Sequence, residues 1–212
     1  MQLIPTINEK TFEEIEKKIK LVENLVDLIQ LDIADGKFTN YETWNNPEDL
    51  LKLETFARFE IHLMVEHPEL IVERWLKIPL VKRIIVHLET IDENVFEKIL
   101  KLTHQYQKEL GLAIKTKTPW EALEPYLNKI NFVQILAVSA GPAGQIFDFS
   151  NLEKIKNLKA KYPHLTIEVD GGVNNDTAPL IKAAGADIIC SSSYLFADLN
   201  KVEEKIKFLE NI

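Results

Sequence analysis

The sequence has 212 residues, of which 46% are hydrophobic and 27% charged, and its formal net charge is −8. This composition is typical of a globular protein that can bury a full apolar core, in one large α/β domain or two small ones. The negative charge argues against nucleic-acid binding through the overall field, although a local site could still bind a small anion.

The start of the chain and its hydropathy predict a cytoplasmic protein without a membrane partner. The segment "MQLIPTINEK" has neither a basic region nor a long apolar core, so we do not expect a signal peptide. No stretch approaches the roughly 18 apolar residues of a membrane span. The only cysteine, Cys190, excludes an internal disulfide framework, and its apolar neighbours predict a buried, inert thiol.

Strand-like and helix-like segments alternate along the chain. A strand at 3–7 precedes an amphipathic helix at 11–26, where Thr11 and Glu14 predict a capping box. Further strands are expected at 27–35, 58–65, 81–89, 110–116, 132–139, 165–173 and 186–193. Further helices are expected near 47–55, after Pro68, near 92–106, from Pro119, and near 150–162, 177–184 and 199–210.

This alternation predicts an α/β fold, a (β/α)8 TIM barrel that forms a single domain over residues 1–212. Strands that alternate with helices indicate parallel βαβ units, and eight such units close into a barrel. No linker rich in Gly, Pro or Ser interrupts the series. A doubly wound open sheet is the alternative, but it would be expected to have a glycine-rich turn after the first strand, and "PTINEKTF" has none.

The active site of such a barrel lies at the C-terminal ends of its strands. The polar or sulfur-containing side chains expected there are Gln30, Asp32, His62, Met64, His87, Glu89, Lys115, Asp170 and Ser191–Ser193. Taken singly, each has a structural explanation, and Asp35 before Gly36 is expected to stabilise a turn. Taken together, Asp32, His62 and Asp170 approach the barrel axis from different strands, and burying unpartnered carboxylates is costly. A shared metal or a shared reaction would explain all three.

The two aspartates come from strands that lie well apart in the ring. Carboxylates on opposite sides of a substrate suit a two-base reaction, in which one removes a proton and the other returns a proton to the opposite face. Asp32 and Asp170 therefore predict inversion at a carbon next to a carbonyl group.

Three loops at the same end of the barrel predict a phosphate site. "SAGPAGQ" (139–145), "DGG" (170–172) and "SSS" (191–193) follow the last three strands. Backbone N–H groups near the last two strands and a short helix commonly bind phosphate in these barrels. Dipoles of this kind allow an acidic protein to bind an anion. We therefore expect a phosphorylated ligand.

Seven segments resemble the ribulose-phosphate 3-epimerase family of ribulose-phosphate-binding TIM barrels. They are "LDIADGKF", "EIHLMVEHPE", "VHLE", "GLAIKTKTPWE", "GPAGQIF", "IEVDGGVN" and "AGADIICSSSYLF", in the order and spacing of that family. The resemblance implies an isomerase of the pentose phosphate pathway that interconverts ribulose 5-phosphate and xylulose 5-phosphate by inverting C3. It also implies a phosphorylated ketose as substrate and a homo-oligomer, since the family commonly forms dimers or hexamers.

The resemblance assigns roles to individual residues. Asp32 and Asp170 would be the acid–base pair and, with His62, ligands of a divalent metal (zinc, iron or manganese). The phosphate would be bound by Gly141, Ala143, Gly144, Gly171, Gly172, Ser192 and Ser193. Met64, Ala34, Leu136 and Glu9 would line the sugar pocket, and the last three replace two methionines and a serine of the family.

Gln30 stands where the family has a histidine as the fourth ligand. An amide oxygen is a poorer zinc ligand than an imidazole, so the substitution predicts an altered metal site. Gln30 could ligate weakly, or its NH2 group could donate to the oxygen of the enediolate. Two other functions stay open: epimerisation of another ketose phosphate such as allulose 6-phosphate, and phosphosugar binding without catalysis. The decarboxylases and hexulose-phosphate synthases of related barrels are disfavoured, because "DIAD" lacks the lysine of their Asp-x-Lys-x-x-Asp motif.

Overall fold

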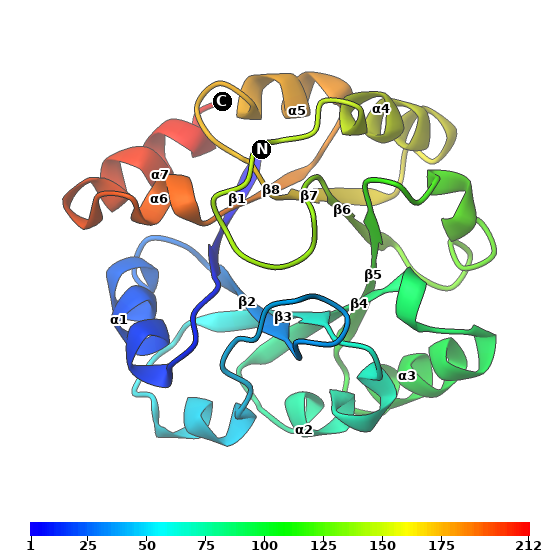
Figure 1. Cartoon of the computed structure of the whole chain (residues 1–212), viewed down its shortest axis with the longest axis horizontal. Coiled ribbons are helices and arrows are strands. Elements are labelled where there is room, and N and C mark those ends of the chain that lie inside the picture. The colour runs from blue at the N-terminus through cyan, green and yellow to red at the C-terminus, as the bar shows by residue number, and fades with distance from the viewer.

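Eight parallel strands close into a barrel in the computed structural model, which describes residues 1–212 (Figure 1). The strands follow one another around the ring in chain order, and the first pairs with the last. They are β1 (Gln2–Ile7), β2 (Leu28–Ala34), β3 (Arg58–Met64), β4 (Val81–His87), β5 (Glu109–Lys115), β6 (Phe132–Leu136), β7 (Thr166–Asp170) and β8 (Ile188–Ser191). The predicted barrel is confirmed, and the open sheet is excluded because no strand is left as an edge.

Helices surround this ring on the outside (Figure 1). The α-helices are α1 (Phe12–Val22), α2 (Val72–Leu76), α3 (Glu93–Gln105), α4 (Asn151–Lys161), α5 (Ala178–Ala184), α6 (Ser193–Phe196) and α7 (Val202–Glu210). Short 3-10 helices are η1 (Pro47–Lys52), η2 (Pro68–Leu70), η3 (Leu88–Thr90), η4 (Trp120–Leu123) and η5 (Leu199–Lys201). No helix has the length and apolar character needed to cross a bilayer.

Helix α1 begins where the capping signal predicts. The Thr11 hydroxyl accepts a hydrogen bond from the backbone N–H of Glu14 at 3.3 Å, and Ile15 and Ile19 are fully buried against the barrel. Such a cap satisfies one of the N–H groups that have no partner inside the helix. The helix ends at Val22, earlier than the expected residue 26.

Two expected α-helices are 3-10 turns instead. The segment from Pro119 forms only η4, because Pro125 lacks the N–H that a continuing helix needs and its ring crowds the preceding turn. The segment near 47–55 forms η1, and Leu53 then adopts an extended conformation with its side chain buried. The connection after Pro68 divides into η2 and the short α2.

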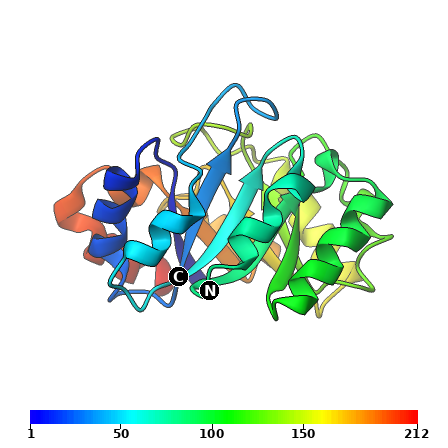
Figure 2. The same ribbon diagram turned by 90° about the horizontal axis from the view of Figure 1, so that it is seen from below.

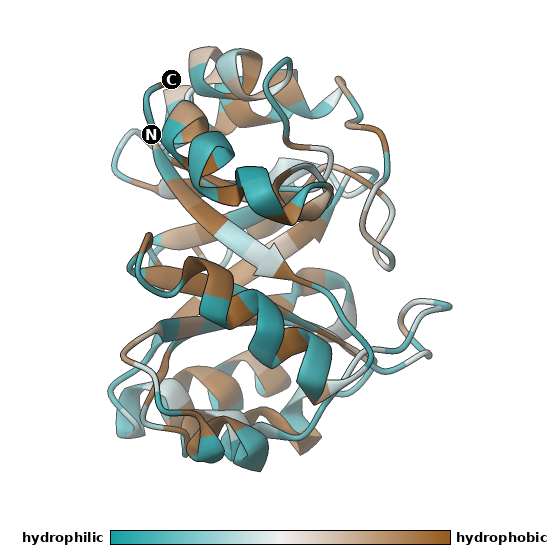
Figure 3. Ribbon diagram, turned by 90° about the vertical axis from the view of Figure 1, so that its left-hand side faces the viewer, coloured by the Kyte–Doolittle hydropathy of each residue, from teal (hydrophilic) through white to brown (hydrophobic).

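The strands are mostly apolar because helices cover one face and the barrel interior fills the other. Figure 3 shows this contrast: the strands are largely brown, while the helices facing the viewer carry teal segments. Fully buried polar residues break the pattern inside the barrel, among them Thr6, Gln30, Glu60, Gln134 and Glu168. Parallel register places Gln30 beside Glu60 and Gln134 beside Glu168. They form a polar layer beneath the C-terminal ends of the strands.

The two ends of the barrel differ in shape. The labelled termini lie at one end, and the connection after β2 rises at the opposite end (Figure 2). That opposite end carries the C-terminal ends of the strands, where the sequence predicts the site.

Candidate active site

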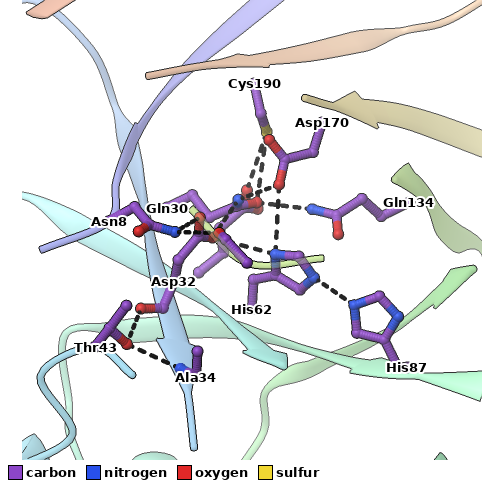
Figure 4. A network of polar contacts seen from close by, with 12 residues as sticks. Asn8, Gln30, Asp32, Ala34, Thr43, His62, His87, Gln134, Asp170 and Cys190 are labelled. Carbon is purple, nitrogen blue, oxygen red and sulfur yellow. Dashed lines mark hydrogen bonds and ion pairs between the residues drawn. The ribbon is translucent and has the colours of Figure 1, made fainter. Parts of the chain in front are cut away.

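Asp32, His62 and Asp170 lie together at the C-terminal ends of their strands (Figure 4). Register pairs Asp32 on β2 with His62 on β3. The Nδ1 atom of His62 lies 3.1 Å from Oδ1 of Asp32 and 3.4 Å from Oδ2 of Asp170. The barrel therefore brings together three residues that are far apart in the sequence, as predicted from their places at strand ends.

Gln30 joins the same group from β2, where it lies two residues before Asp32 on the same face of the strand. Its Nε2 atom donates to Oδ1 of Asp32 and to Oδ2 of Asp170, both at 2.9 Å. Its Oε1 atom points the other way and accepts from Nε2 of Gln134 at 2.8 Å (Figure 4). Of the two roles expected for Gln30, hydrogen-bond donation is the one that this orientation favours.

The carboxylates control the charge of His62. Burial by itself lowers the pKa of this histidine, but its hydrogen bonds to Asp170 and Asp32 and their negative charge raise the pKa to about 10. The ring is therefore protonated at neutral pH and donates Nδ1–H to the carboxylates. Burial raises the pKa of Asp170 above its usual value, although its hydrogen bonds with His62 and Gln30 act in the opposite direction.

His87 and Glu89 support the other side of the His62 ring. The Nε2 atoms of His62 and His87 lie 2.9 Å apart, and Nδ1 of His87 lies 3.2 Å from Oε2 of Glu89. Burial lowers the pKa of His87 to about 4, so this ring is neutral. Its Nδ1–H donates to Glu89, which leaves Nε2 free to accept from His62. His87 is thus a satisfied buried histidine that also orients His62.

Asn8 is a site residue that the sequence did not single out. It is buried at the end of β1, and its Nδ2 atom donates to Oδ2 of Asp32 at 2.8 Å and to the carbonyl of Gly141 at 3.2 Å. The next residue, Glu9, was expected in the sugar pocket, but it forms an ion pair with Lys18 and does not line the cavity. The sequence signal for Asn8 was its amide side chain directly after the first strand.

Asp35 has the structural role expected of it. One of its oxygens accepts from the backbone N–H groups of Lys37 and Phe38, and the other accepts from that of Glu66. Burial would raise the pKa of Asp35, but these backbone N–H groups hold it below its usual value. Asp35 thus stabilises the turn after β2, while Asp32 faces the site.

A small cavity of about 40 Å³ opens above the carboxylates. Asp32, Asp170, Met64 and Leu136 line it, whereas Ala34 is buried and does not line it. Every residue predicted to bind phosphate also lines this cavity: Gly141, Ala143, Gly144, Gly171, Gly172, Ser192 and Ser193. The reacting group and the anion-binding loops therefore face one space.

The loops of this cavity require glycine at specific points. Gly171 and Gly172 have φ values of 101° and 68°, which side chains rarely adopt. A Cβ atom on Gly172 would lie 2.4 Å from the backbone nitrogen of Phe147. The backbone N–H groups of Gly144, Gly172 and Ser193 donate no hydrogen bond within the chain. Free N–H groups around a cavity are suited to an anion.

Comparison with known proteins identifies the family. A sequence model described as "Ribulose-phosphate 3 epimerase family" matches residues 2–196. The chain belongs to this family. It is 29% identical to the ribulose-phosphate 3-epimerase of Schizosaccharomyces pombe over 217 residues, which cover 99% of this chain and 92% of the relative. It is 34% identical to that of Chlamydia pneumoniae over 200 residues, covering 90% and 85%. Membership of the ribulose-phosphate 3-epimerase family makes the chain an isomerase and confirms the resemblance.

Solved structures confirm the fold alone. A 3-hexulose-6-phosphate synthase matches with a TM-score of 0.74 at 15% identity, over 100% of this chain and 99% of that one. The corresponding enzyme of Salmonella typhimurium matches with a TM-score of 0.72 at 12% identity, over 98% and 99%. Both matches span the whole barrel.

The ribulose-phosphate 3-epimerase family implies a divalent metal. Asp32, His62 and Asp170 offer ligand atoms that all lie within 4.8 Å of one another. The fourth corner is the NH2 group of Gln30, which donates hydrogen bonds and has no lone pair for a metal. As oriented, the four groups do not fit the family's four-ligand site.

Proposed function

We propose that this enzyme interconverts D-ribulose 5-phosphate and D-xylulose 5-phosphate by a two-base proton transfer at C3, as a step of the pentose phosphate pathway. Asp32 and Asp170 are the two bases. The observation that carries this proposal is the pair of carboxylates on β2 and β7, hydrogen-bonded to one amide nitrogen at the floor of the cavity.

The reaction needs one carboxylate and one carboxylic acid at a time. The carboxylate takes the C3 proton, and the C–H electron pair moves into a C2–C3 double bond while the C2 carbonyl oxygen becomes an enediolate oxygen. The other aspartic acid then gives its proton to the opposite face of C3, and the carbonyl forms again. One proton is removed and one returned, so only the configuration of C3 changes.

Donors already in place can stabilise the enediolate. The NH2 group of Gln30 and the Nδ1–H of His62 donate to the two carboxylates beneath the cavity, and one of these hydrogen bonds would pass to the enediolate oxygen as its charge develops. Fixed donors of this kind stabilise an oxyanion more than the neutral carbonyl before it. No step in this scheme uses a metal.

The anion-binding loops would place the sugar. The free backbone N–H groups of Gly144, Gly172 and Ser193 support binding of the C5 phosphate at the far wall of the cavity. Met64 and Leu136 give the sugar an apolar contact next to the reacting carbon. We also propose that the enzyme is a homo-oligomer, which light scattering after gel filtration would test.

Incubation of the purified protein with ribulose 5-phosphate in D2O, followed by NMR of the C3 proton, tests the function. Exchange of the C3 proton together with the appearance of xylulose 5-phosphate is the expected result. Parallel samples contain EDTA or added zinc, iron(II) or manganese. Absence of exchange in all samples would reject the proposal, and a trial with allulose 6-phosphate would then separate a different substrate from phosphosugar binding without catalysis.

A further inference from the structure

We propose that Gln134 holds the Gln30 amide with its nitrogen toward Asp32 and Asp170, and that this amide pair (Gln30 and Gln134) closes the site to a divalent cation. Gln134 is then a positioning residue that determines the metal dependence of the enzyme. The inference rests on the proposed function only for the identity of the site, and it is tested by cation binding without substrate.

The contacts of Gln30 favour one orientation of its amide. Its nitrogen has two carboxylate acceptors at 2.9 Å, and its oxygen has the amide nitrogen of Gln134 at 2.8 Å. The thiol of Cys190 also lies 3.5 Å from that oxygen. Turning the amide over would bring its oxygen against two carboxylate oxygens and its nitrogen against the nitrogen of Gln134. The side chain is fully buried, so water could not replace the lost hydrogen bonds.

Gln134 is itself held by a second acceptor. Its Nε2 atom donates to Oε1 of Glu168 at 2.8 Å as well as to Gln30. Its Oε1 atom is buried and has no partner, so the nitrogen makes all the hydrogen bonds of this amide. The orientation set at Glu168 is therefore passed through Gln134 to Gln30 and so to the two aspartates. Figure 4 shows the part of this chain from Gln134 to Gln30.

The spacing at the site shows what this orientation excludes. The Gln30 nitrogen lies 2.9 Å from both carboxylates, and the His62 Nδ1 atom lies 3.1 Å and 3.4 Å from them. Two donors and two acceptors thus form a closed square. A cation placed among them would meet N–H groups at the Gln30 corner instead of a lone pair. It could enter only if Gln30 turned its oxygen inward, which Gln134 opposes.

Direct cation binding tests this inference. The full chain, stripped with EDTA, is titrated with Zn²⁺ in competition with a chromophoric chelator, and with Co²⁺ while its visible absorption is recorded. The variants are Gln30→His, which restores an imidazole ligand, and Gln134→Met, which keeps the size of the side chain but removes the donor. Gln105→Met, the same change at an exposed position of α3, is the matched control.

We expect Gln134→Met to bind Zn²⁺ about 10- to 100-fold more tightly than the native chain. Changing a group that orients a metal ligand typically alters affinity by this factor, and here the sign is a gain because Gln134 holds the Gln30 oxygen away from the site. Gln30→His should gain at least as much, with a tetrahedral Co²⁺ spectrum, and Gln105→Met should not change. If Gln134→Met does not fold, Gln134→Leu applies the same test, because it also fills the space with an apolar side chain and removes the donor to the Gln30 oxygen.

Two results would overturn the inference. Native protein that binds Zn²⁺ as tightly as Gln30→His would show that the amide pair does not exclude the cation. A gain in Gln30→His alone, with the folded Gln134 variants equal to the native chain, would show that Gln134 has no part in it. Neither result depends on turnover, so the proposed reaction could fail while this inference stands.

Discussion

Replacing one aspartate at a time should separate proton removal from inversion. In Asp170→Asn, the new amide oxygen can still accept from the Gln30 nitrogen, which lies 2.9 Å from Oδ2 of Asp170. The arrangement of the site is therefore kept, and only the group that carries a proton is lost. Asp32 keeps its contacts with Asn8 and Gln30 and can still remove a proton from the epimer whose C3 hydrogen faces it.

The size of the effect follows from the role of a single acid–base group. Such a group contributes about 10²- to 10⁴-fold to a rate. Since each factor of ten is worth about 1.4 kcal/mol of barrier, the loss for inversion is about 3–6 kcal/mol. Exchange of one epimer's C3 proton, which needs only Asp32, should fall far less.

Proton NMR in D2O measures both quantities in one sample. With Asp170→Asn, one of the two epimers should exchange its C3 proton while almost none of the other appears. With Asp32→Asn, the other epimer should be the one that exchanges its C3 proton. If both variants exchanged the same epimer, or if inversion and exchange fell in parallel in both, the two-base assignment would be wrong.

Three further changes test the surroundings of the site. Asn8→Ala should lower kcat by about tenfold, because Asp32 loses a buried donor worth about 1–3 kcal/mol, and an unchanged kcat would remove Asn8 from the site. Gly172→Ala should raise KM for the phosphorylated substrate and lower the melting temperature, because its Cβ would lie 2.4 Å from the Phe147 nitrogen; an unchanged KM would argue against a phosphate contact there. Glu89→Gln should reduce the unfolding free energy above pH 4.5 by about 3 kcal/mol at most, because the folded pKa of Glu89 is about 2. A carboxyl pKa that is lowered by folding stabilises the fold above the pKa of the unfolded chain. The difference in unfolding free energy between the native chain and the variant should therefore vanish as the pH falls from 4.5 through 2. Denaturant titrations that give the same difference at every pH would exclude this cause.

The barrel and the meeting of the charged residues could be predicted from sequence because both follow from regular geometry. Alternating strands and helices give parallel strands whose C-terminal ends share one end of the barrel. Asp32, His62 and Asp170 were recognisable because each is a polar residue at such an end, and the structure brings them within hydrogen-bond distance. The role of Asp35 could be distinguished from that of Asp32 because Gly36 follows Asp35 and indicates a turn.

The features that were missed depend on details that strand order does not contain. Placement of Asn8 rather than Glu9 at the cavity depends on where β1 ends, because a shift of one position would exchange the side chain that faces the site for the one that faces away. The orientation of Gln30 depends on Gln134, 104 residues away in the chain, and no local pattern links the two. The short helix after Pro119 is explained by Pro125, which cannot donate the backbone hydrogen bond of a continuing α-helix.

Gln30, at the position where the family has a histidine, affects the charge of the neighbouring ligand residue His62 as well as its own position. Two carboxylates that face each other in a barrel need balancing positive charge or donors. A cation would supply this charge only while His62 is neutral and offers a lone pair. With the Gln30 nitrogen at one corner, His62 instead is protonated, with a pKa of about 10, and its second N–H is accepted by neutral His87. The imidazolium and the amide together balance Asp32 and Asp170, so the substitution at Gln30 and the charge of His62 form one arrangement. Restoring histidine at position 30 should therefore lower the pKa of His62 when zinc is bound, which NMR titration of its ring protons would detect.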